Sequence, residues 1–485
     1  MKNSEELRQQ LRSINRKSYP AYKGLKGLYH FGNYILSIDH VQGDPFASPS
    51  HVSIQISHRD AGFPVEYYKD TLTGTTLCDY LTRQFEKQVS QYSFRAKGSG
   101  KSGLLTVSHC GQEILSRTAC EITEKGITAR FFVGFPANGR TINATELEKI
   151  LFDFLPVCIQ KSFFYSSLNA KELQNYIELA EDQEFIRQTL PAKNLCAFIA
   201  DGSILPRESG ISSRPMKASV PFTSPDSLRI SINLPHKGKI TGMGIPKGIT
   251  LIVGGGYHGK STLLNALELG VYNHIPGDGR EYVITDATAV KLRSEDGRFI
   301  KDVNISMFIN DLPNKKDTRC FSTLDASGST SQAAGIIESM EAGSHLFLLD
   351  EDTSATNFMV RDAFMQQVIQ REKEPITPFL ERAEDLYKKA GISTILVAGS
   401  SGAFFHIADT IIQMDNYVPK DITASVKKLC SQYPLPAVSV TDFQLPHSHR
   451  IMSRPAESSK RLIHNSRGNH SDSGAAKPER LKTRI

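Results

Sequence analysis

Little in this sequence points to secretion or to a membrane. Its 485 residues include only seven cysteines, spaced ten or more residues apart, which favours reduced thiols over a disulfide framework or a zinc site. The amino terminus, MKNSEELRQQLRSINRK, is polar from the start, and no run of eighteen apolar residues occurs anywhere. We therefore expect a cytoplasmic protein that is neither secreted nor membrane-spanning.

The net charge of the chain is concentrated at its end. The formal charge is +6, and residues 450–485 hold nine basic and three acidic side chains, whereas residues 1–449 hold 48 of each sign. After about residue 435 the chain is rich in Ser, His, Arg and Pro and has almost no apolar periodicity. We predict that residues 436–485 form a mobile basic tail on a neutral folded body.

The first 200 residues are typical of a mixed α+β domain. Apolar side chains alternate over residues 52–56 and 127–133, which predicts half-buried antiparallel strands. The helices that we expect around them span residues 79–91, 144–153 and 169–190. A segment rich in Pro, Ser and Gly at 201–227 then predicts a linker or an ordered surface loop, and with it a domain boundary.

A glycine-rich loop lies near the start of the second predicted domain, residues 228–435. The run GGGYHGKSTLLNAL follows the apolar strand 249–253, precedes a helix-forming stretch and contains Gly254-x-x-x-x-Gly259-Lys260-Ser261. This is the complete phosphate-binding loop pattern, in the strand-to-helix context that it requires. The residues that we expect to bind a nucleotide here are Gly254, Gly255, Gly256, Tyr257, His258, Gly259, Lys260, Ser261 and Thr262.

Each residue type in this loop has a physical reason. Glycines allow successive backbone N–H groups to point into one concavity, and the positive end of the following helix adds to the attraction for phosphate. We expect Lys260 to neutralise the β- and γ-phosphates, and so to act in catalysis, and Ser261 to supply a hydroxyl ligand to Mg²⁺. The predicted cofactors are therefore ATP and Mg²⁺.

An apolar strand that ends in acids begins 85 residues after Lys260, in the run HLFLLDED. Many buried strands end in an acidic turn, so the pattern gains its meaning from the phosphate loop that precedes it. Asp350, at the carboxyl end of the strand, is expected to hold Mg²⁺ through water. Glu351 is then the predicted catalytic base, which polarises the attacking water.

A third pattern, ASGSTSQ at 326–332, precedes an apolar stripe at helical spacing. It predicts a helix amino terminus, which is either an ordinary cap or a second place for an anion. The order of phosphate loop, Ser-Gly helix start and acid-ended strand resembles the ATPase domain of ABC proteins. We therefore expect an α/β fold of the P-loop NTPase type.

More narrowly, the chain is similar to the predicted ATPases of the ABC class, a poorly characterised soluble family. The segments GMGIPKGITLIVGGGYHGKSTLL, DASGSTSQAA and LLDEDTSATNFMVRD carry the resemblance, which extends upstream to DHVQGDPFASPS, GSGKSG and DGSILPRESG and covers most of residues 1–440. The resemblance implies a homodimer in which Ser327, Gly328 and Ser329 of one copy contact the nucleotide held by the other. It also implies that residues 352–357 form the turn through which two sites communicate, and that relatives extend beyond the end of this chain.

The sequence departs from the general ABC pattern at two catalytic positions. No Gln occurs between Ser261 and Gln332, so a substitute is expected among four polar residues: Glu295, Asp296, Ser306 and Asn310. The switch histidine is replaced by the segment 399–402, GSSG, and the next histidine is His406. In addition, no aromatic side chain lies between Phe222 and the loop to stack on a base. These gaps predict slow or partner-stimulated hydrolysis.

Three functions are open at this point. The first is an ABC-class ATPase coupled to nucleic acid, RNA more than DNA, through the basic tail and a basic loop near Lys101. The second is a nucleotide-gated scaffold with little turnover, which the missing Gln and His favour. The third is a P-loop small-molecule kinase. The loop near Lys101, GSGKSG at 98–103, lacks the first glycine of a phosphate loop, so we interpret it as a flexible basic loop and not as a second nucleotide site.

Overall fold

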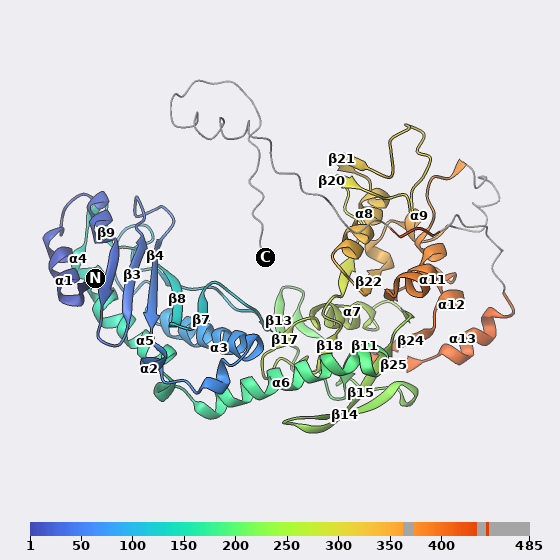
Figure 1. Ribbon diagram of the computed structural model, residues 1–485, viewed down its shortest axis with the longest axis horizontal. Helices are drawn as coiled ribbons and strands as arrows, with labels where there is room; N and C mark the ends of the chain where they lie inside the picture. Colours follow the sequence, from blue (N-terminus) through green and yellow to red (C-terminus); the bar gives the residue numbers. More distant parts are fainter. Residues whose placement is uncertain (362–372, 434–442, 446–485) are drawn as a thin grey trace. The chain divides into compact units, whose positions relative to one another are not determined.

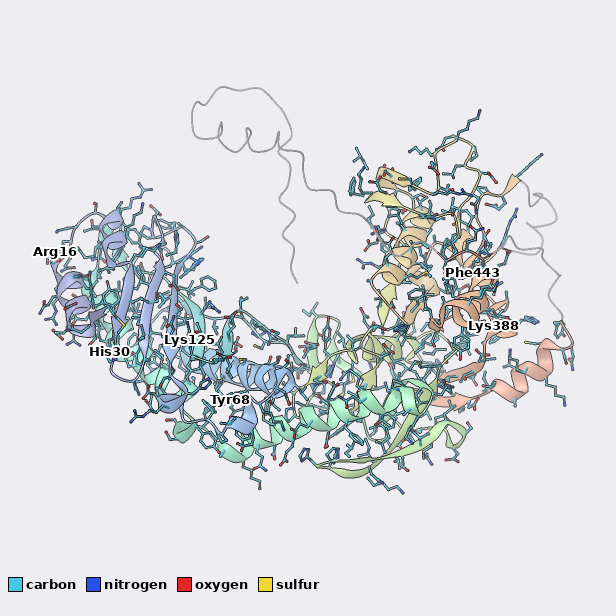
Figure 2. All side chains as sticks on the ribbon, in the orientation of Figure 1. Arg16, His30, Tyr68, Lys125, Lys388 and Phe443 are labelled. Atoms are coloured by element: carbon cyan, nitrogen blue, oxygen red, sulfur yellow. The ribbon has the colours of Figure 1, made fainter. Side chains whose placement is uncertain are left out.

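A mostly antiparallel sheet organises the amino-terminal region. The computed structural model describes residues 1–361, 373–433 and 443–445 (Figure 1). The sheet has the strand order β1-β2-β3-β4-β8-β5, and β7 pairs with β8. Its strands are β1 (Lys2–Asn3), β2 (Gly27–His30), β3 (Ile35–His40), β4 (Ser50–Ile56), β5 (Leu105–Thr106), β7 (Cys120–Thr123) and β8 (Gly126–Val133). Both strands predicted from alternation are present, and Lys125 lies in the turn between β7 and β8 (Figure 2).

Helices bury one face of this sheet. They are α1 (Ser4–Ser13), α2 (His58–Ala61), α3 (Thr71–Ser90), α4 (Ala144–Glu148) and α5 (Leu155–Phe163), and a π-helical segment, Lys149–Phe154, joins the last two. Leu7 and Leu11 of α1 are fully buried in the same core as the sheet. Helix α3 begins at Asp70, whose side chain accepts the N–H of Thr73 in a capping box, so a local polar pattern sets its start.

A long helix, α6 (Ala170–Ala192), connects this region to the rest of the chain and packs against α3 and β11. Gln183, in its middle, is fully buried and exchanges two hydrogen bonds with the backbone of His274. A short antiparallel pair, β6 (Glu113–Ile114) with β17 (Asn273–His274), joins the two regions a second time. The described residues 1–361, 373–433 and 443–445 accordingly belong to one compact unit.

The phosphate loop follows an inner strand, β16, of a six-stranded sheet with the order β19-β22-β23-β16-β24-β25. It lies at the end of the sheet where the parallel strands have their carboxyl ends. All neighbours pair in parallel except β24 and β25. Its strands are β16 (Ile249–Val253), β19 (Val290–Leu292), β22 (Leu346–Asp350), β23 (Ser393–Val397), β24 (Thr410–Asp415) and β25 (Val418–Asp421). The central strands are buried along their length, as their continuous apolar runs predict.

A second, antiparallel sheet has the order β14-β15-β11-β18. Its strands are β11 (Leu195–Ala200), β14 (Arg229–Leu234), β15 (Gly238–Pro246) and β18 (Val283–Thr285). The predicted linker 201–227 runs between β11 and β14 and contains a hairpin of β12 (Arg207–Ser209) and β13 (Ser212–Pro215). The proposed division into residues 1–200, 201–227 and 228–435 stays a prediction.

The remaining helices and strands surround the parallel sheet. They are α7 (Lys260–Leu269), α8 (Gly328–Glu341), α9 (Thr356–Met359), α11 (Phe379–Ala390), α12 (Phe404–Ile407), α13 (Thr423–Cys430), and the pair β20 (Arg298–Val303) with β21 (Phe321–Ala326). A further pair, β9 (Ala137–Asn138) with β10 (Thr141–Ile142), lies in the amino-terminal region. The predicted α/β fold is confirmed. Within the described ranges no helix is both long and apolar enough to cross a membrane. Apart from residues 443–445, the predicted tail 436–485 lies outside the described residues.

Candidate nucleotide site

Three functional segments follow neighbouring parallel strands. Strand β16 leads into the glycine-rich loop, β23 leads into Gly399 and Ser400, and β22 ends at Asp350. Because parallel strands present their carboxyl ends at one edge of a sheet, the loop and the acids converge there although they are about ninety residues apart in the chain. Sequence order alone does not reveal that β23 separates the other two strands.

The loop after β16 exposes unused hydrogen-bond donors. In the part of the chain that the structure describes, none of the backbone N–H groups of residues 255–259 donates to a protein acceptor. Helix α7 then starts at Lys260, with Gly259 as its amino-terminal cap residue. A cluster of unpaired N–H groups at a helix amino terminus is an anion-binding concavity, because it adds fixed partial positive charges to the helix dipole.

Two glycines make this loop conformation possible. Gly254 has a φ of +141°, and a Cβ there would lie 2.4 Å from the backbone oxygen of Met414. Gly259 has a φ of +98°, and a Cβ there would lie 2.7 Å from the ring of Tyr417. Any larger residue would therefore be strained at either position and would push against strand β24 or the turn after it.

Hydrogen bonds of Lys260 and His258 hold the phosphate loop in its conformation. The ammonium of Lys260 donates to the carbonyl oxygens of Gly254 (2.7 Å) and Gly255 (3.0 Å). The Nδ1 atom of His258 accepts the backbone N–H of Asn416 at 2.9 Å, so this histidine holds the loop against the turn between β24 and β25. Tyr257 has a positive φ of 63° and is fully exposed.

Asp350 is a buried carboxylate close to two lysines. Burial raises its pKa above the ordinary value and the charge of Asp352 adds to this, whereas the N–H of Asp352 and the charges of Lys291 and Lys260 act in the opposite direction. A carboxylate stripped of water in this way gains from a nearby cation. Lys291, on β19, also donates to Glu268 at 2.8 Å, so it joins the sheet edge to helix α7.

Glu351, the predicted base, is held by the segment that replaces the switch histidine. Its Oε2 atom accepts the N–H groups of Gly399 (2.7 Å) and Ser400 (2.9 Å), and its Oε1 atom accepts the hydroxyl of Ser400 (2.7 Å). Burial alone would raise the pKa of Glu351, but the hydrogen bonds from Ser400, Gly399 and Ser401 outweigh it and lower the pKa. A carboxylate held in this way is a weak proton acceptor.

The predicted helix start at 326–332 is present and connects to the turn after Glu351. Ser327 is the cap residue of α8, and its side chain accepts the N–H of Thr330. The Ser329 hydroxyl donates to the side chain of Asn357 at 2.8 Å. Gln332 is fully buried, donates to Ser354 and accepts the N–H of Ala355. Helix α8 and the 352–357 turn therefore form one hydrogen-bonded unit.

The four candidate substitutes for the missing Gln lie in two places. A Cβ on Gly328 would be 3.1 Å from Asp296, and the N–H of Glu295 donates to Ser331, so both acids lie beside the start of α8. Ser306 and Asn310 hydrogen-bond to each other in a separate turn. Among the described residues, no hydrogen bond joins any of the four to Asp350 or Glu351, and the substitution stays a prediction.

Backbone hydrogen bonds connect the basic loop at 98–103, which we expected to be flexible, to distant parts of the chain. Its N–H groups are used within the fold: Ser99 donates to Ala137, Lys101 to Pro45, and Gly103 to Gly134. The loop is an ordered turn because these partners, distant in sequence, pair with its backbone. That this loop is not a second nucleotide site stays a prediction.

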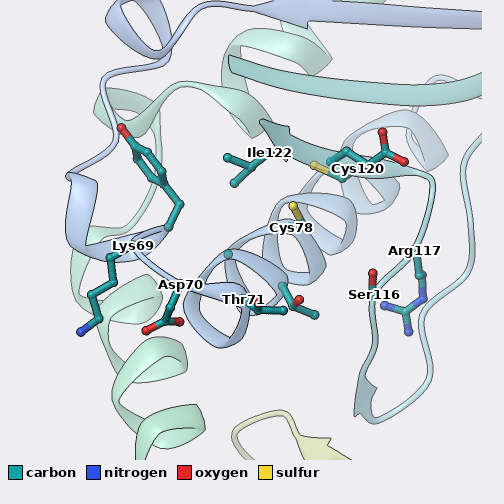
Figure 3. Close-up of a pocket in the computed structure, with 12 residues that line it drawn as sticks. Lys69, Asp70, Thr71, Cys78, Ser116, Arg117, Cys120 and Ile122 are labelled. Atoms are coloured by element: carbon teal, nitrogen blue, oxygen red, sulfur yellow. The ribbon is translucent and has the colours of Figure 1, made fainter. Parts of the chain in front are cut away.

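A separate cavity of about 450 Å³ lies between the start of α3 and β7 (Figure 3). Cys78 and Cys120 face each other at its wall. A hydrogen bond with Cys78 and burial together raise the pKa of Cys120 well above its ordinary value, which keeps this thiol protonated. Arg117, also at the wall, forms an ion pair with the fully buried Asp79. Cys120 is therefore not an activated nucleophile.

The sequence reading missed three residues of the candidate site. Only the hydrogen bond to Glu351 identifies Ser400 as part of the site. Lys291 is identified only by its position between Asp350 and α7. Tyr417, which has a φ of +67°, packs against the phosphate loop from a hairpin turn. A non-glycine residue in that conformation is uncommon, but no local sequence pattern announces it.

Known proteins provide an independent comparison. An uncharacterized protein of Methanocaldococcus jannaschii is 30% identical over 266 residues, which are 52% of this chain and 58% of the relative. The chain thus spans less than two thirds of that relative. Two solved structures are also similar: an ATP-binding cassette of an ABC transporter in its ADP conformation (13% identity, 40% of this chain and 89% of the other, TM-score 0.27) and cbiO1 from Clostridium perfringens, part of an ABC transporter complex (14%, 40% and 86%, TM-score 0.25).

Family models cover nearly all of the described chain. Residues 4–166 match the model described as the amino-terminal part of ATPases of the ABC class. Residues 169–448, more than half of the chain, match the P-loop domain model of the ABC ATPase family. The loop, the acids and the helix start described above all lie in the second match. The chain therefore belongs to the family of ABC-class ATPases.

Proposed function

We propose that this protein binds and hydrolyses ATP with Mg²⁺ at sites shared between two copies of the chain, and that it couples this reaction to binding or remodelling RNA. The observation that carries the first part is the set of unpaired N–H groups at 255–259, at the same sheet edge as Asp350 and Glu351. The seven free cysteines fit a reducing compartment, and we place the protein in the cytoplasm.

The residues at this edge fit a nucleotide with its metal. Ser261 and Asp350 would hold Mg²⁺, which when bound neutralises charge on the phosphate oxygens. Lys260, which rests on carbonyl oxygens of the loop, would exchange these for phosphate oxygens. Glu351 would accept a proton from water after giving up its bond to Ser400.

A second copy of the chain would complete each site. Among described residues, no hydrogen bond or ion pair joins Ser327, Gly328 or Ser329 to the phosphate loop of the same chain, and Ser329 instead contacts Asn357. In a symmetric dimer the same surfaces of both copies pair, so two composite sites would form.

Mixing two inactive variants tests the composite site. Lys260→Ala disables the loop and Ser327→Arg blocks the helix start, so each homodimer should be inactive. A mixed dimer contains one fully intact site, and an equal mixture should recover about one quarter of the wild-type rate, since half of the dimers are mixed and each has one of two sites. No recovery, with mixed dimers verified by mass, would contradict sites shared between chains.

An exposed aromatic row supports the RNA partner. His40, His51 and Phe132 lie side by side on β3, β4 and β8, with ring centroids 5.4 Å and 5.0 Å apart, and Phe132 is 39% exposed. Antiparallel sheets that display aromatic rings in this way bind single-stranded RNA by stacking on its bases. The turn at 98–103 pairs with Gly134, two residues beyond Phe132, so Lys101 borders the row.

The RNA proposal is tested by measuring affinity for a single-stranded RNA at two salt concentrations. Stacking contributes about 1–3 kcal/mol per base, so Phe132→Ala should weaken binding about fivefold to more than a hundredfold. Phe185→Ala, which removes an equally exposed ring (39%) from α6, is the matched control and should bind as the wild type does. Equal affinity of wild type and Phe132→Ala would remove this surface from the proposal.

One observation favours a second function, the nucleotide-gated scaffold with little turnover. Glu351 accepts three hydrogen bonds in the structure, which opposes its use as a base. Turnover with and without RNA separates the two functions. Stimulation by RNA that weakens as salt rises supports the coupled ATPase. Nucleotide binding and dimerisation without turnover under either condition support the scaffold.

A further inference from the structure

A cavity of about 570 Å³ begins at the first turn of helix α7, directly after the phosphate loop, and continues along one side of that helix. Thr262, the second residue after Lys260, lies at its wall, and Asn265 and Glu268 continue that wall one and two turns further on. The opposite wall is the β12–β13 hairpin, whose tip is Ile211. The cavity is thus an extension of the loop and falls within the size range of small-molecule sites.

Two arginines hold the hairpin in place against α7. Arg207, on β12, is bonded to the carboxylate of Asp278 at 2.9 Å and to its carbonyl at 2.7 Å. Arg280 is 3% exposed and donates through Nε to the carbonyl of Leu205, just before the hairpin, at 2.9 Å. Burial lowers the pKa of Arg280 to about 10, but the side chain stays charged at neutral pH. The wall is therefore a built part of the fold.

The tip of the hairpin is chemically unusual for a surface. Ile211 is completely exposed, and it lies between Gly210 and Ser212. On the facing wall, Glu268 and Asn265 share Lys291 as a donor, at 2.8 and 3.2 Å. An apolar side chain opposite carboxylate and amide groups suits a ligand with one flat apolar face and several hydroxyl groups.

We propose that this cavity receives the nucleoside, the base with its ribose, of the nucleotide held by the phosphate loop. Phosphate loops cradle the α- and β-phosphates in their N–H groups, so the nucleoside emerges beside the first turn of the helix, where Thr262 lies. Ile211 covers a face of the base in place of a stacking aromatic ring. Glu268 accepts hydrogen bonds from ribose hydroxyls, since a carboxylate has acceptor capacity beyond its bond to Lys291.

This inference rests on the proposed nucleotide binding. Two ligands test the nucleoside site and the phosphate site independently. ADP carries phosphates and a nucleoside, whereas inorganic tripolyphosphate carries phosphates alone. Lys260→Ala should weaken the binding of both. Ile211→Ser should weaken ADP about tenfold, the effect of exposing one isoleucine-sized contact, and leave tripolyphosphate unchanged. Glu268→Gln should likewise weaken ADP alone.

The matched control is Leu324→Ser, which removes another highly exposed aliphatic side chain (82%) on β21. It should bind both ligands as the wild type does. Calorimetric titration of the full chain with ADP and with tripolyphosphate gives both constants. Unchanged ADP affinity in both Ile211→Ser and Glu268→Gln would overturn the nucleoside site and leave the proposed phosphate binding untouched. The same holds if these variants lose affinity for ADP and for tripolyphosphate by equal factors. Wild-type protein that binds neither ligand would overturn the proposed function and this inference with it.

Discussion

The bond between Ser400 and Glu351 yields the sharpest prediction. Ser400→Ala removes the hydroxyl donor to Oε1 and keeps the two N–H donors to Oε2. Hydrogen bonds to charged groups contribute about 1.5–3 kcal/mol, and partial exposure of this pair reduces the figure to about 1 kcal/mol. If the bond must break before Glu351 accepts a proton, the variant should turn over ATP about five times faster, since about 1 kcal/mol of barrier is removed.

The pH dependence of the rate gives an independent readout. Hydrogen bonds lower the pKa of Glu351 below its ordinary value, although burial opposes them, so losing one should raise it. The acidic limb of the kcat profile should therefore move to higher pH in Ser400→Ala, measured by phosphate release between about pH 5 and about pH 9. Ser401→Ala is the matched control because it changes a neighbouring hydroxyl and keeps every donor to Glu351. A slower Ser400→Ala with an unmoved acidic limb would refute the reasoning and show that Ser400 positions the base.

Ser400→Ala should also lower the free energy of unfolding. A carboxylate with a lowered pKa in the folded state stabilises the fold above its unfolded pKa, and this contribution is lost as pH falls through the folded value. Ser400→Ala should therefore unfold about 1 kcal/mol more easily at neutral pH, and the difference from wild type should shrink in acid. Denaturant titrations at neutral and acidic pH measure this difference.

Three further predictions follow from single features. Gly254→Ala should lower the free energy of unfolding by about 2–4 kcal/mol, because its Cβ meets the backbone of Met414, whereas Gly256→Ala, with open space around it, should fold normally in the same denaturation assay. Gln332→Leu should cost about 1–3 kcal/mol by leaving the N–H of Ala355 without its acceptor, and should slow turnover through the 352–357 turn. Truncation to residues 1–449 should keep ATP binding and flatten the salt dependence of RNA affinity, because nine basic side chains are removed.

Local patterns in the sequence were sufficient for the elements that depend on neighbours in the chain. The phosphate loop, the acid-ended strand and the capped helix start are each continuous segments whose geometry follows from residue types at fixed spacing. The same holds for the alternating strands β4 and β8. The helix predicted at 144–153 was only partly right, because a π-helical segment at 149–154 separates α4 from α5.

Features that depend on contacts between residues far apart in the chain could not be predicted from the sequence. The turn at 98–103 donates N–H groups to the carbonyl oxygens of Pro45, Gly134 and Ala137, a pairing that no local pattern encodes. Ser400 and Glu351 are 49 residues apart and meet only because β22 and β23 are adjacent parallel strands. Likewise, the wall of the α7 cavity depends on Arg280 reaching back 75 residues to Leu205. Composition identified residues 201–227 as a loop but not as a wall of that cavity.

The bonds around the 352–357 turn suggest how two composite sites would sense each other. Ser329 and Gln332 attach the start of α8 to Asn357 and Ser354, and the same turn begins directly after Glu351. In the proposed dimer, α8 of one chain approaches the nucleotide of the other. A nucleotide that pulls on Ser327 would then displace the turn that carries the first chain's own base. Because Glu351 is restrained by Ser400 on its other side, such a displacement would favour its release, so nucleotide at one site would speed hydrolysis at the other. The mixed dimer of Lys260→Ala and Ser327→Arg, whose second site is disabled, would then recover less than the roughly one quarter of the rate that two independent sites give.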